Sequence, residues 1–253
     1  MKKLSAVIIS FNEEEKIERC IKSLQQIADE VLVLDSFSTD RTQQIVKSLN
    51  ARLEVHKFHG YIEQKNIALS LATYNNIISL DADEVLSPEL QQSIQKEKEK
   101  DFPFEGYNMN RLTFIGDKPI KCCGWYPDKK IRLFNKALGQ WKGTNPHDEY
   151  KFHHRQPVKH LNGDILHYSF KDFGDLEQQT HRFAAISAAA YREKKKRTVP
   201  FVTVLSPGVR FFKDFFLKKG YLYGKTGFRV AYYNSLGTKL KYQKLNQLIN
   251  DNK

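Results

Sequence analysis

The first third of the chain alternates short apolar runs with longer segments of helical periodicity, and this alternation constrains the fold more than any other feature. Strands are predicted at residues 5–10, 31–35, 53–56 and 77–80, with amphipathic helices between them, the first of which Asn12 is expected to cap. Strands that are apolar throughout are buried on both faces, which is typical of parallel sheets with helices on either side. We therefore expect an α/β fold with a mostly parallel sheet flanked by helices.

The pattern changes after a predicted helix at 88–98, which Ser87 is expected to cap. Strands with polar alternation are predicted at 106–114, 130–134 and 165–168, between loops rich in Gly, Pro, Trp and His. This irregular middle is where we expect an acceptor pocket. Helices then return over 176–196 and from Pro207 onward.

Positive charge is concentrated in the last two fifths of the chain. Residues 1–150 hold 21 Lys and Arg against 22 Asp and Glu, whereas residues 151–253 hold 20 against 7. A neutral first part and a basic second part predict two roles. The basic part could contact nucleic acid, anionic lipid or a phosphorylated substrate.

The chain carries no pattern of a membrane-spanning or secreted protein. Its mean hydropathy is −0.57, and no apolar run approaches the length that crosses a bilayer. The residues after Met1 lack a signal-peptide pattern, so a cytoplasmic protein is expected. Cys20, Cys122 and Cys123 make neither a disulfide framework nor a zinc pattern, and we interpret them as buried thiols.

Chemically distinctive side chains cluster where the predicted strands end. Ligands of open α/β sheets bind at the carboxyl edge. The candidates at this edge are Phe11 and Asn12 after the first strand, Asp35 at the end of the second, Lys65 on the following helix, and Asp81 and Asp83 after the fourth.

An aromatic ring and a carboxylate can hold a nucleobase, and a lysine and a metal can hold a pyrophosphate. The sequence thus predicts a nucleoside-diphosphate site without a glycine-rich phosphate loop. Asp81-Ala-Asp83 alone could also be a solvated acidic turn.

Three of these segments resemble the motifs of family 2 glycosyltransferases, which have the GT-A fold. They are Val7-Ile-Ile-Ser-Phe-Asn-Glu-Glu, Val33-Leu-Asp-Ser-Phe-Ser-Thr-Asp-Arg-Thr and Leu80-Asp-Ala-Asp-Glu. Gly124-Trp-Tyr-Pro-Asp-Lys-Lys-Ile-Arg-Leu-Phe134, His147-Asp148 and Leu166-His-Tyr-Ser169 resemble the branch of bacterial lipopolysaccharide-core β-glucosyltransferases. Phe37, where the family often has Gly, and the Asn-Pro before His147 depart from the pattern.

The resemblance implies a GT-A domain over 1–170 and a helical, basic extension over 171–253. Within the domain, 1–100 would bind the nucleotide sugar and 101–170 the acceptor. The implied reaction is an inverting, metal-dependent transfer of a hexose, with glucose from UDP-glucose as the first choice. The implied acceptor is a lipopolysaccharide core or another lipid-linked glycan.

The resemblance also implies residue roles. Asp83, Asp81 and His147 would hold Mg²⁺ or Mn²⁺, and Asp148 or, as second choice, Asp128 would be the general base. The implied nucleotide-sugar-binding residues are Phe11, Asn12, Glu13, Asp35, Lys65, Asp81, Ala82 and Arg132.

The basic, aromatic C-terminal part adds the expectation of contact with the inner face of an anionic membrane, through Lys194–Arg197 and an arc formed by Phe211, Phe212, Phe215 and Phe216. The alternatives are a sugar nucleotidyltransferase, a nucleic-acid-binding protein, and an inactive sugar-binding relative. No nucleic-acid-binding motif is present, so nucleic acid is not the expected partner.

Overall fold

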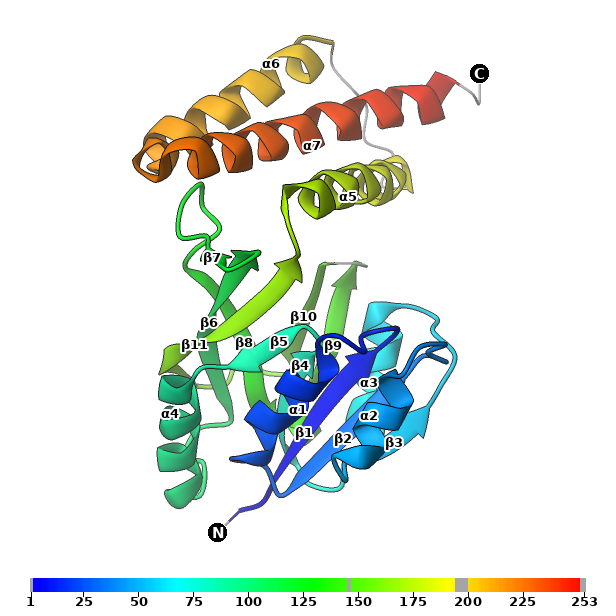
Figure 1. Ribbon diagram of the computed structural model, residues 1–253, viewed down its shortest axis with the longest axis vertical. Coiled ribbons are helices and arrows are strands. Elements are labelled where there is room, and N and C mark those ends of the chain that lie inside the picture. The colour runs from blue at the N-terminus through cyan, green and yellow to red at the C-terminus, as the bar shows by residue number, and fades with distance from the viewer. Residues whose placement is uncertain (1, 145–146, 194–199, 251–253) are drawn as a thin grey trace. The chain divides into compact units, whose positions relative to one another are not determined.

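The computed structural model describes residues 2–144, 147–193 and 200–250 (Figure 1). The chain forms two compact units, one of Met1–Leu112 with Asp128–His167 and the other of Thr113–Pro127 with Tyr168–Lys253. The division of the chain into functional domains at residue 170 stays a prediction. Sequence reasoning did not anticipate that residues 113–127 pack with the C-terminal part.

Four parallel strands form one half of the sheet. They are β1 (Leu4–Ser10), β2 (Glu30–Asp35), β3 (Arg52–Val55) and β4 (Asn76–Asp81), in the order β3-β2-β1-β4. Ser10 pairs with Asp35, and Ile9 pairs with Asp81. This register brings the carboxyl ends of β1, β2 and β4 to one edge of the sheet, as predicted from the positions of the strands in the sequence.

The other half of the sheet makes the whole sheet mixed rather than parallel. β8 (Asp128–Asn135) runs antiparallel to β4, and β6 (Gly106–Ile115), β11 (Val158–Phe170) and β5 (Glu84–Leu86) continue the order. β7 (Lys118–Pro119) pairs with β6. A short helix η1 (Lys136–Leu138) precedes β9 (Gly139–Thr144), which pairs with β10 (His147–Phe152) in a separate sheet.

Helices cover both faces of the parallel strands, because successive side chains of a strand point to opposite faces. On one face, α1 (Ile17–Gln25), α2 (Thr42–Ser48) and α4 (Pro88–Glu99) pack against residues such as Val33. On the other face, α3 (Tyr61–Leu71) packs against residues such as Leu32 and Leu34. Cys20 lies in the first of these cores, as predicted, and Ser87 caps α4 by accepting from Leu90 N.

The loop after β1 differs from the prediction. Asn12 was expected to cap a helix, but its φ is +54° and α1 begins only at Ile17. The Asn12 side chain instead accepts a hydrogen bond from Thr39 N at 2.8 Å. The backbone N–H of Asn12 donates to Ser38 Oγ, also at 2.8 Å. These bonds join the loops that follow β1 and β2.

The second unit is mainly helical, as expected of the C-terminal part. It contains α5 (Phe173–Glu193), α6 (Pro200–Phe212), η2 (Lys213–Leu217), η3 (Gly220–Tyr223) and α7 (Gly224–Asn250). α7 packs along both α5 and α6. Cys122 and Cys123 are free thiols in the core of this unit, together with Leu176 and Val230. The prediction that Pro207 starts a helix is wrong, because it lies inside α6.

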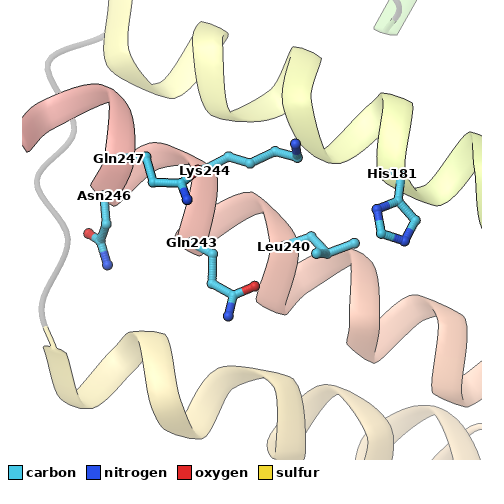
Figure 2. Close-up of a pocket in the computed structure, with 6 residues that line it drawn as sticks. All are labelled: His181, Leu240, Gln243, Lys244, Asn246 and Gln247. Atoms are coloured by element: carbon cyan, nitrogen blue, oxygen red, sulfur yellow. The ribbon is translucent and has the colours of Figure 1, made fainter. Parts of the chain in front are cut away.

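A hollow of about 440 Å³ in this unit is lined by His181 of α5 and by residues of α7 (Figure 2). The α7 residues are Leu240, Gln243, Lys244, Asn246 and Gln247. The lining contains no carboxylate, so it lacks the acidic group that the predicted metal site requires. Within the described parts of the chain, no helix combines the length and apolarity needed to cross a membrane.

Candidate active site

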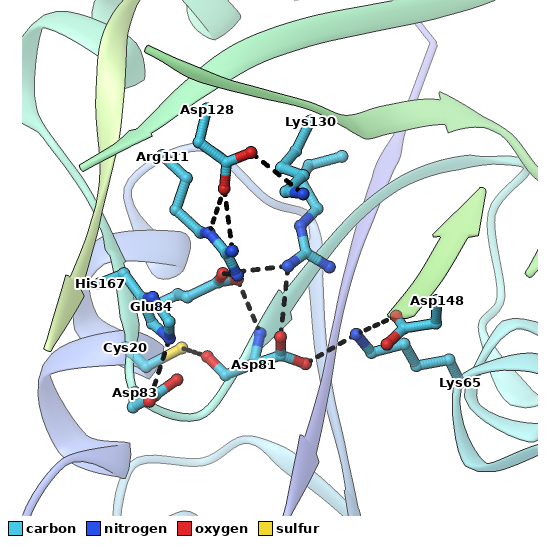
Figure 3. A network of polar contacts seen from close by, with 11 residues as sticks. Cys20, Lys65, Asp81, Asp83, Glu84, Arg111, Asp128, Lys130, Asp148 and His167 are labelled. Atoms are coloured by element: carbon cyan, nitrogen blue, oxygen red, sulfur yellow. Dashed lines mark hydrogen bonds and ion pairs between the residues drawn. The ribbon is translucent and has the colours of Figure 1, made fainter. Parts of the chain in front are cut away.

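Asp81 ends β4 and is held by two cations. Lys65 Nζ lies 2.9 Å from its Oδ1, and Arg132 Nη2 lies 3.2 Å from its Oδ2 (Figure 3). Burial opposes ionisation of this carboxyl, but the charges of Lys65 and Arg132 outweigh burial and hold the pKa of Asp81 well below its ordinary range. Asp81 is therefore an ionised carboxylate whose two oxygens are already engaged.

Asp83 lies two residues further, in the turn between β4 and β5, and has a different environment. Its Oδ2 is 3.2 Å from His167 Nε2, on β11. Among the described residues, no lysine or arginine forms an ion pair with it. Burial raises the pKa of Asp83, but the charge and hydrogen bond of His167 and the charge of Lys16 lower it, and the net shift is downward.

Glu84 is a residue that sequence reasoning missed. It is completely buried at the start of β5, and its Oε2 accepts a hydrogen bond from Asp81 N at 3.0 Å. Its Oε1 accepts from Arg132 Nη2, also at 3.0 Å. Burial disfavours the charged form of Arg132, but Glu84 and Asp81 outweigh it and raise the pKa of that guanidinium. Glu84 thus fixes both the turn and the arginine beside Asp81.

The two candidate bases have different partners. Asp148, on β10, has its Oδ2 2.7 Å from Lys65 Nζ, so Lys65 joins Asp148 to Asp81. Asp128, at the start of β8, accepts from Arg111 Nε at 3.0 Å and lies 3.1 Å from Lys130 Nζ. The sequence did not single out Arg111 or Lys130. Figure 3 shows these groups as one connected network of charges.

The ring of Trp141, on β9, lies beside the charged groups of Lys65 and Arg132. Lys65 Nζ lies 4.6 Å from a Trp141 ring centroid, and the Arg132 guanidinium carbon lies 5.5 Å from it. Both distances fall within the range of cation–π attraction. The sequence assigned Trp141 only to the irregular middle, because its neighbouring residues carry no signal that β9 packs beside Lys65 of α3 and Arg132 of β8.

Asp35 organises the loop after β2. It is fully buried, and its carboxylate accepts hydrogen bonds from Ser10 Oγ, Ser38 N and Gln43 Nε2. Phe37 in this loop has a φ of +61° and is exposed, as is Phe11 after β1. Two exposed phenylalanines thus lie on the paired loops at the carboxyl ends of neighbouring strands.

The remaining predicted residues have mixed environments. Burial raises the pKa of Glu13, whose carboxylate lies 3.6 Å from Lys16 Nζ. Ala82 is buried in the core below the turn, so only its backbone could meet a ligand. The side chain of His147 lies outside the described part of the structure, and its role stays a prediction.

The acidic turn suits a metal that takes most of its ligands from elsewhere. Among the described residues, no group of three or more His, Cys, Asp or Glu side chains is arranged to surround an ion. Within the described residues, the Asp83 carboxylate has no lysine or arginine contact, and His167 Nε2 lies beside its Oδ2 and can orient it. These carboxylate oxygens fit Mg²⁺ or Mn²⁺ that keeps several waters and shares phosphate oxygens.

Comparison with known proteins agrees with these motifs. Residues 5–120 match the family model described as glycosyl transferase family 2. An uncharacterized glycosyltransferase of Rickettsia typhi is 30% identical over 98% of this chain and 88% of its own length. The lipopolysaccharide core biosynthesis glycosyltransferase LpsC of Rhizobium meliloti is 24% identical over 90% of this chain and 86% of its own. TarS 1-349 of S. aureus superposes with a TM-score of 0.48 at 15% identity, over 96% of this chain and 91% of that chain.

Proposed function

Since the chain belongs to glycosyltransferase family 2, we propose that it transfers a hexose from a UDP-sugar, with a divalent cation at Asp83. The preferred donor is UDP-glucose, and the preferred stereochemical outcome is inversion. The proposal rests on one contrast: both oxygens of Asp81 are bound by cations, whereas Asp83 contacts an imidazole. Of the two aspartates, Asp83 is therefore the one available to a metal.

The residues around this pair suit a nucleoside diphosphate. The exposed rings of Phe11 and Phe37 can stack on a base, and Asp35 holds the loop that carries Phe37. Lys65 and Arg132 supply positive charge beside the acidic turn. When bound, Mg²⁺ or Mn²⁺ neutralises negative charge on the departing diphosphate, which is electrostatic stabilisation of the leaving group.

We assign the general base to Asp148 in preference to Asp128. Arg111 donates to one oxygen of Asp128, and Lys130 forms an ion pair with the other. In the described part of the chain, Asp148 forms one ion pair, through Oδ2 to Lys65. Its second carboxylate oxygen is thus the better candidate to accept the proton of an acceptor hydroxyl. Lys65 would hold Asp148 in position.

The acceptor proposal follows the named relative. LpsC carries a name from lipopolysaccharide core biosynthesis, and we extend this acceptor class, a core or another lipid-linked glycan, to this chain. An acceptor anchored in lipid places the reaction at a membrane face, in keeping with the basic C-terminal part. A sugar nucleotidyltransferase or a nucleic-acid-binding protein gains no support from the family match.

The direct test combines donor binding with transfer. Thermal unfolding is followed with UDP and UDP-glucose, each with and without Mn²⁺ or Mg²⁺. We expect the metal to increase the shift caused by UDP, because a ligand that binds only the folded state stabilises it. In Asp83→Asn the metal-dependent increment should disappear, together with transfer of labelled glucose to a core oligosaccharide.

The matched control is Asp117→Asn, because Asp117 is an exposed aspartate outside the acidic turn. It should keep both the increment and the transfer. If Asp83→Asn retains full metal-dependent transfer, the proposed metal site is wrong. Release of pyrophosphate from a nucleoside triphosphate and a sugar phosphate would instead identify a nucleotidyltransferase.

A further inference from the structure

The second unit exposes large apolar side chains at eleven positions between residues 204 and 232, along α6, η2, η3 and the start of α7. Soluble monomers that expose extensive apolar surface commonly use it to bind a partner or a membrane. We call this series the apolar rim. Its members are Val204, Leu205, Val209, Phe212, Phe216, Leu217, Tyr221, Leu222, Tyr223, Phe228 and Tyr232.

Of the predicted membrane-contacting residues, Lys194–Arg197 lie outside the described part of the chain, and the structure revises which aromatic residues belong to the surface. The sequence predicted that four phenylalanines, at 211, 212, 215 and 216, share one broad arc. Phe211 and Phe215 instead stack on each other at 5.5 Å and pack on the core of the unit. Phe212 and Phe216 face outward, and Leu217 and Leu222 are even more exposed, at 68% and 63%. The exposed series therefore combines aromatic rings with aliphatic side chains.

In the described part of the chain, the face of α6 that bears these residues is exposed. Val204, Leu205, Val209 and Phe212 recur at spacings that place them on one broad face of the helix. Gly208 lies on this face, and a Cβ added to it would meet no atom within 4 Å. Other residues of α6 pack against α7.

Charge decides which kind of partner this rim fits. Residues 200–250 contain nine lysines and arginines and a single acidic residue, Asp214. Asp214 is completely buried and is paired with Arg210 and Lys218. Exposed lysines such as Lys213 and Lys225 lie among the rim residues in the chain. An apolar surface whose exposed charged neighbours within residues 200–250 are all positive matches an anionic lipid bilayer.

A second copy of the chain and a nucleic acid fit less well. Two copies joined at this rim would face each other with like charges, which opposes association. The phosphates of a nucleic acid would pair with the lysines, but exposed valine and leucine side chains can neither stack on its bases nor hydrogen-bond to them.

We therefore propose that the apolar rim inserts into the interface of an anionic membrane, with the lysines contacting lipid headgroups. This inference deepens the proposed function, since it rests on a lipid-linked acceptor.

The test measures flotation of the full chain with lipid vesicles, in the absence of donor, metal and acceptor. One vesicle set is phosphatidylcholine, and the other contains one third phosphatidylglycerol. We expect binding to the anionic set at low salt, weakening as salt screens the lysines. Leu217→Ser with Leu222→Ser should weaken partitioning by about tenfold per leucine inserted. Lys213→Glu with Lys225→Glu should weaken it by at least about 25-fold.

Phe183→Ser is the control for the apolar change, because Phe183 is 38% exposed on α5, outside the rim. It should float like the unaltered chain. Absence of binding to anionic vesicles at low salt, or equal binding to both sets, would overturn the proposal. So would a dimer that Leu217→Ser with Leu222→Ser converts to monomers, or a gel shift with nucleic acid at physiological salt that the lysine reversals abolish.

Membrane binding and transfer are separable in this design. If the rim variants lose flotation but keep donor binding, the membrane inference holds independently of the chemistry. If the full chain floats with anionic vesicles while Asp83→Asn keeps full metal-dependent transfer, the result supports membrane binding by the apolar rim and contradicts the proposed metal site.

Discussion

Asp81 and Asp148 share a single ammonium group, because Lys65 Nζ lies 2.9 Å from Asp81 Oδ1 and 2.7 Å from Asp148 Oδ2. One of these carboxylates ends β4, and the other lies on β10. Lys65 itself is almost completely buried on α3. The lysine thus joins the turn proposed to hold the metal to the proposed general base.

Lys65→Ala should be strongly destabilising. Removing one partner of a buried ion pair leaves charge uncompensated, and the expected loss in the free energy of unfolding is about 3 kcal/mol. Urea unfolding at neutral pH measures it. Lys22→Ala, which breaks the exposed pair of Lys22 with Glu18, should cost less than about 0.5 kcal/mol. Equal effects of the two substitutions would contradict a structural role for the Lys65 junction.

His167→Ala should weaken metal use without abolishing transfer. His167 Nε2 contacts Asp83 Oδ2, and loss of a group that orients a ligand commonly lowers metal affinity by about 10- to 100-fold. The measurement is transfer rate against Mn²⁺ concentration. His160→Ala is the control, because exposed His160 contacts Asn108. An unchanged half-saturating Mn²⁺ concentration in His167→Ala would show that this contact does not support the metal.

Glu30 should make the fold sensitive to acid. Burial raises its pKa, but hydrogen bonds from Ser5 and Thr73 outweigh burial, and the pKa of Glu30 lies below its ordinary value. A lowered folded-state pKa stabilises the fold above the unfolded-state value, and this stability is lost as pH falls through the folded-state value. The urea concentration at the unfolding midpoint should therefore decrease as the pH is lowered below about 4.5. In Glu30→Gln this fall should be shallower, and an identical pH profile would contradict the assignment.

Gly163→Ala should be among the most damaging single-methyl additions. Gly163 has a φ of +94°, and an added Cβ would lie 2.4 Å from Leu90 N at the start of α4. Left-handed strain and overpacking together predict a loss of roughly 2–4 kcal/mol in unfolding free energy. Gly208→Ala, which meets open space inside α6, should instead be neutral or stabilise the helix by about 0.5–1 kcal/mol. Thermal or urea unfolding compares the two variants, and equal stability of both would refute the steric argument.

Much of the first unit could be predicted because its signals are local. The apolar runs that became β1, β2 and β4, and the stripe of Ile17, Cys20, Ile21 and Leu24 on α1, follow directly from periodicity. The carboxyl-edge position of Asp35 and Asp81 follows from parallel strand order. The antiparallel half was less predictable, because its strand pairing depends on contacts between distant segments.

Local sequence patterns were enough to identify the family, the α/β class and the strand-end aspartates, because short motifs and hydrophobic periodicity depend only on neighbouring residues. Only the tertiary structure distinguished Asp83 from Asp81. That difference depends on Lys65, Arg132 and His167, which arrive from α3, β8 and β11. Tertiary packing likewise turned Phe211 and Phe215 inward and left Leu217 and Leu222 exposed. Long-range packing fixes the partners of a side chain, and those partners give two chemically identical carboxylates different environments.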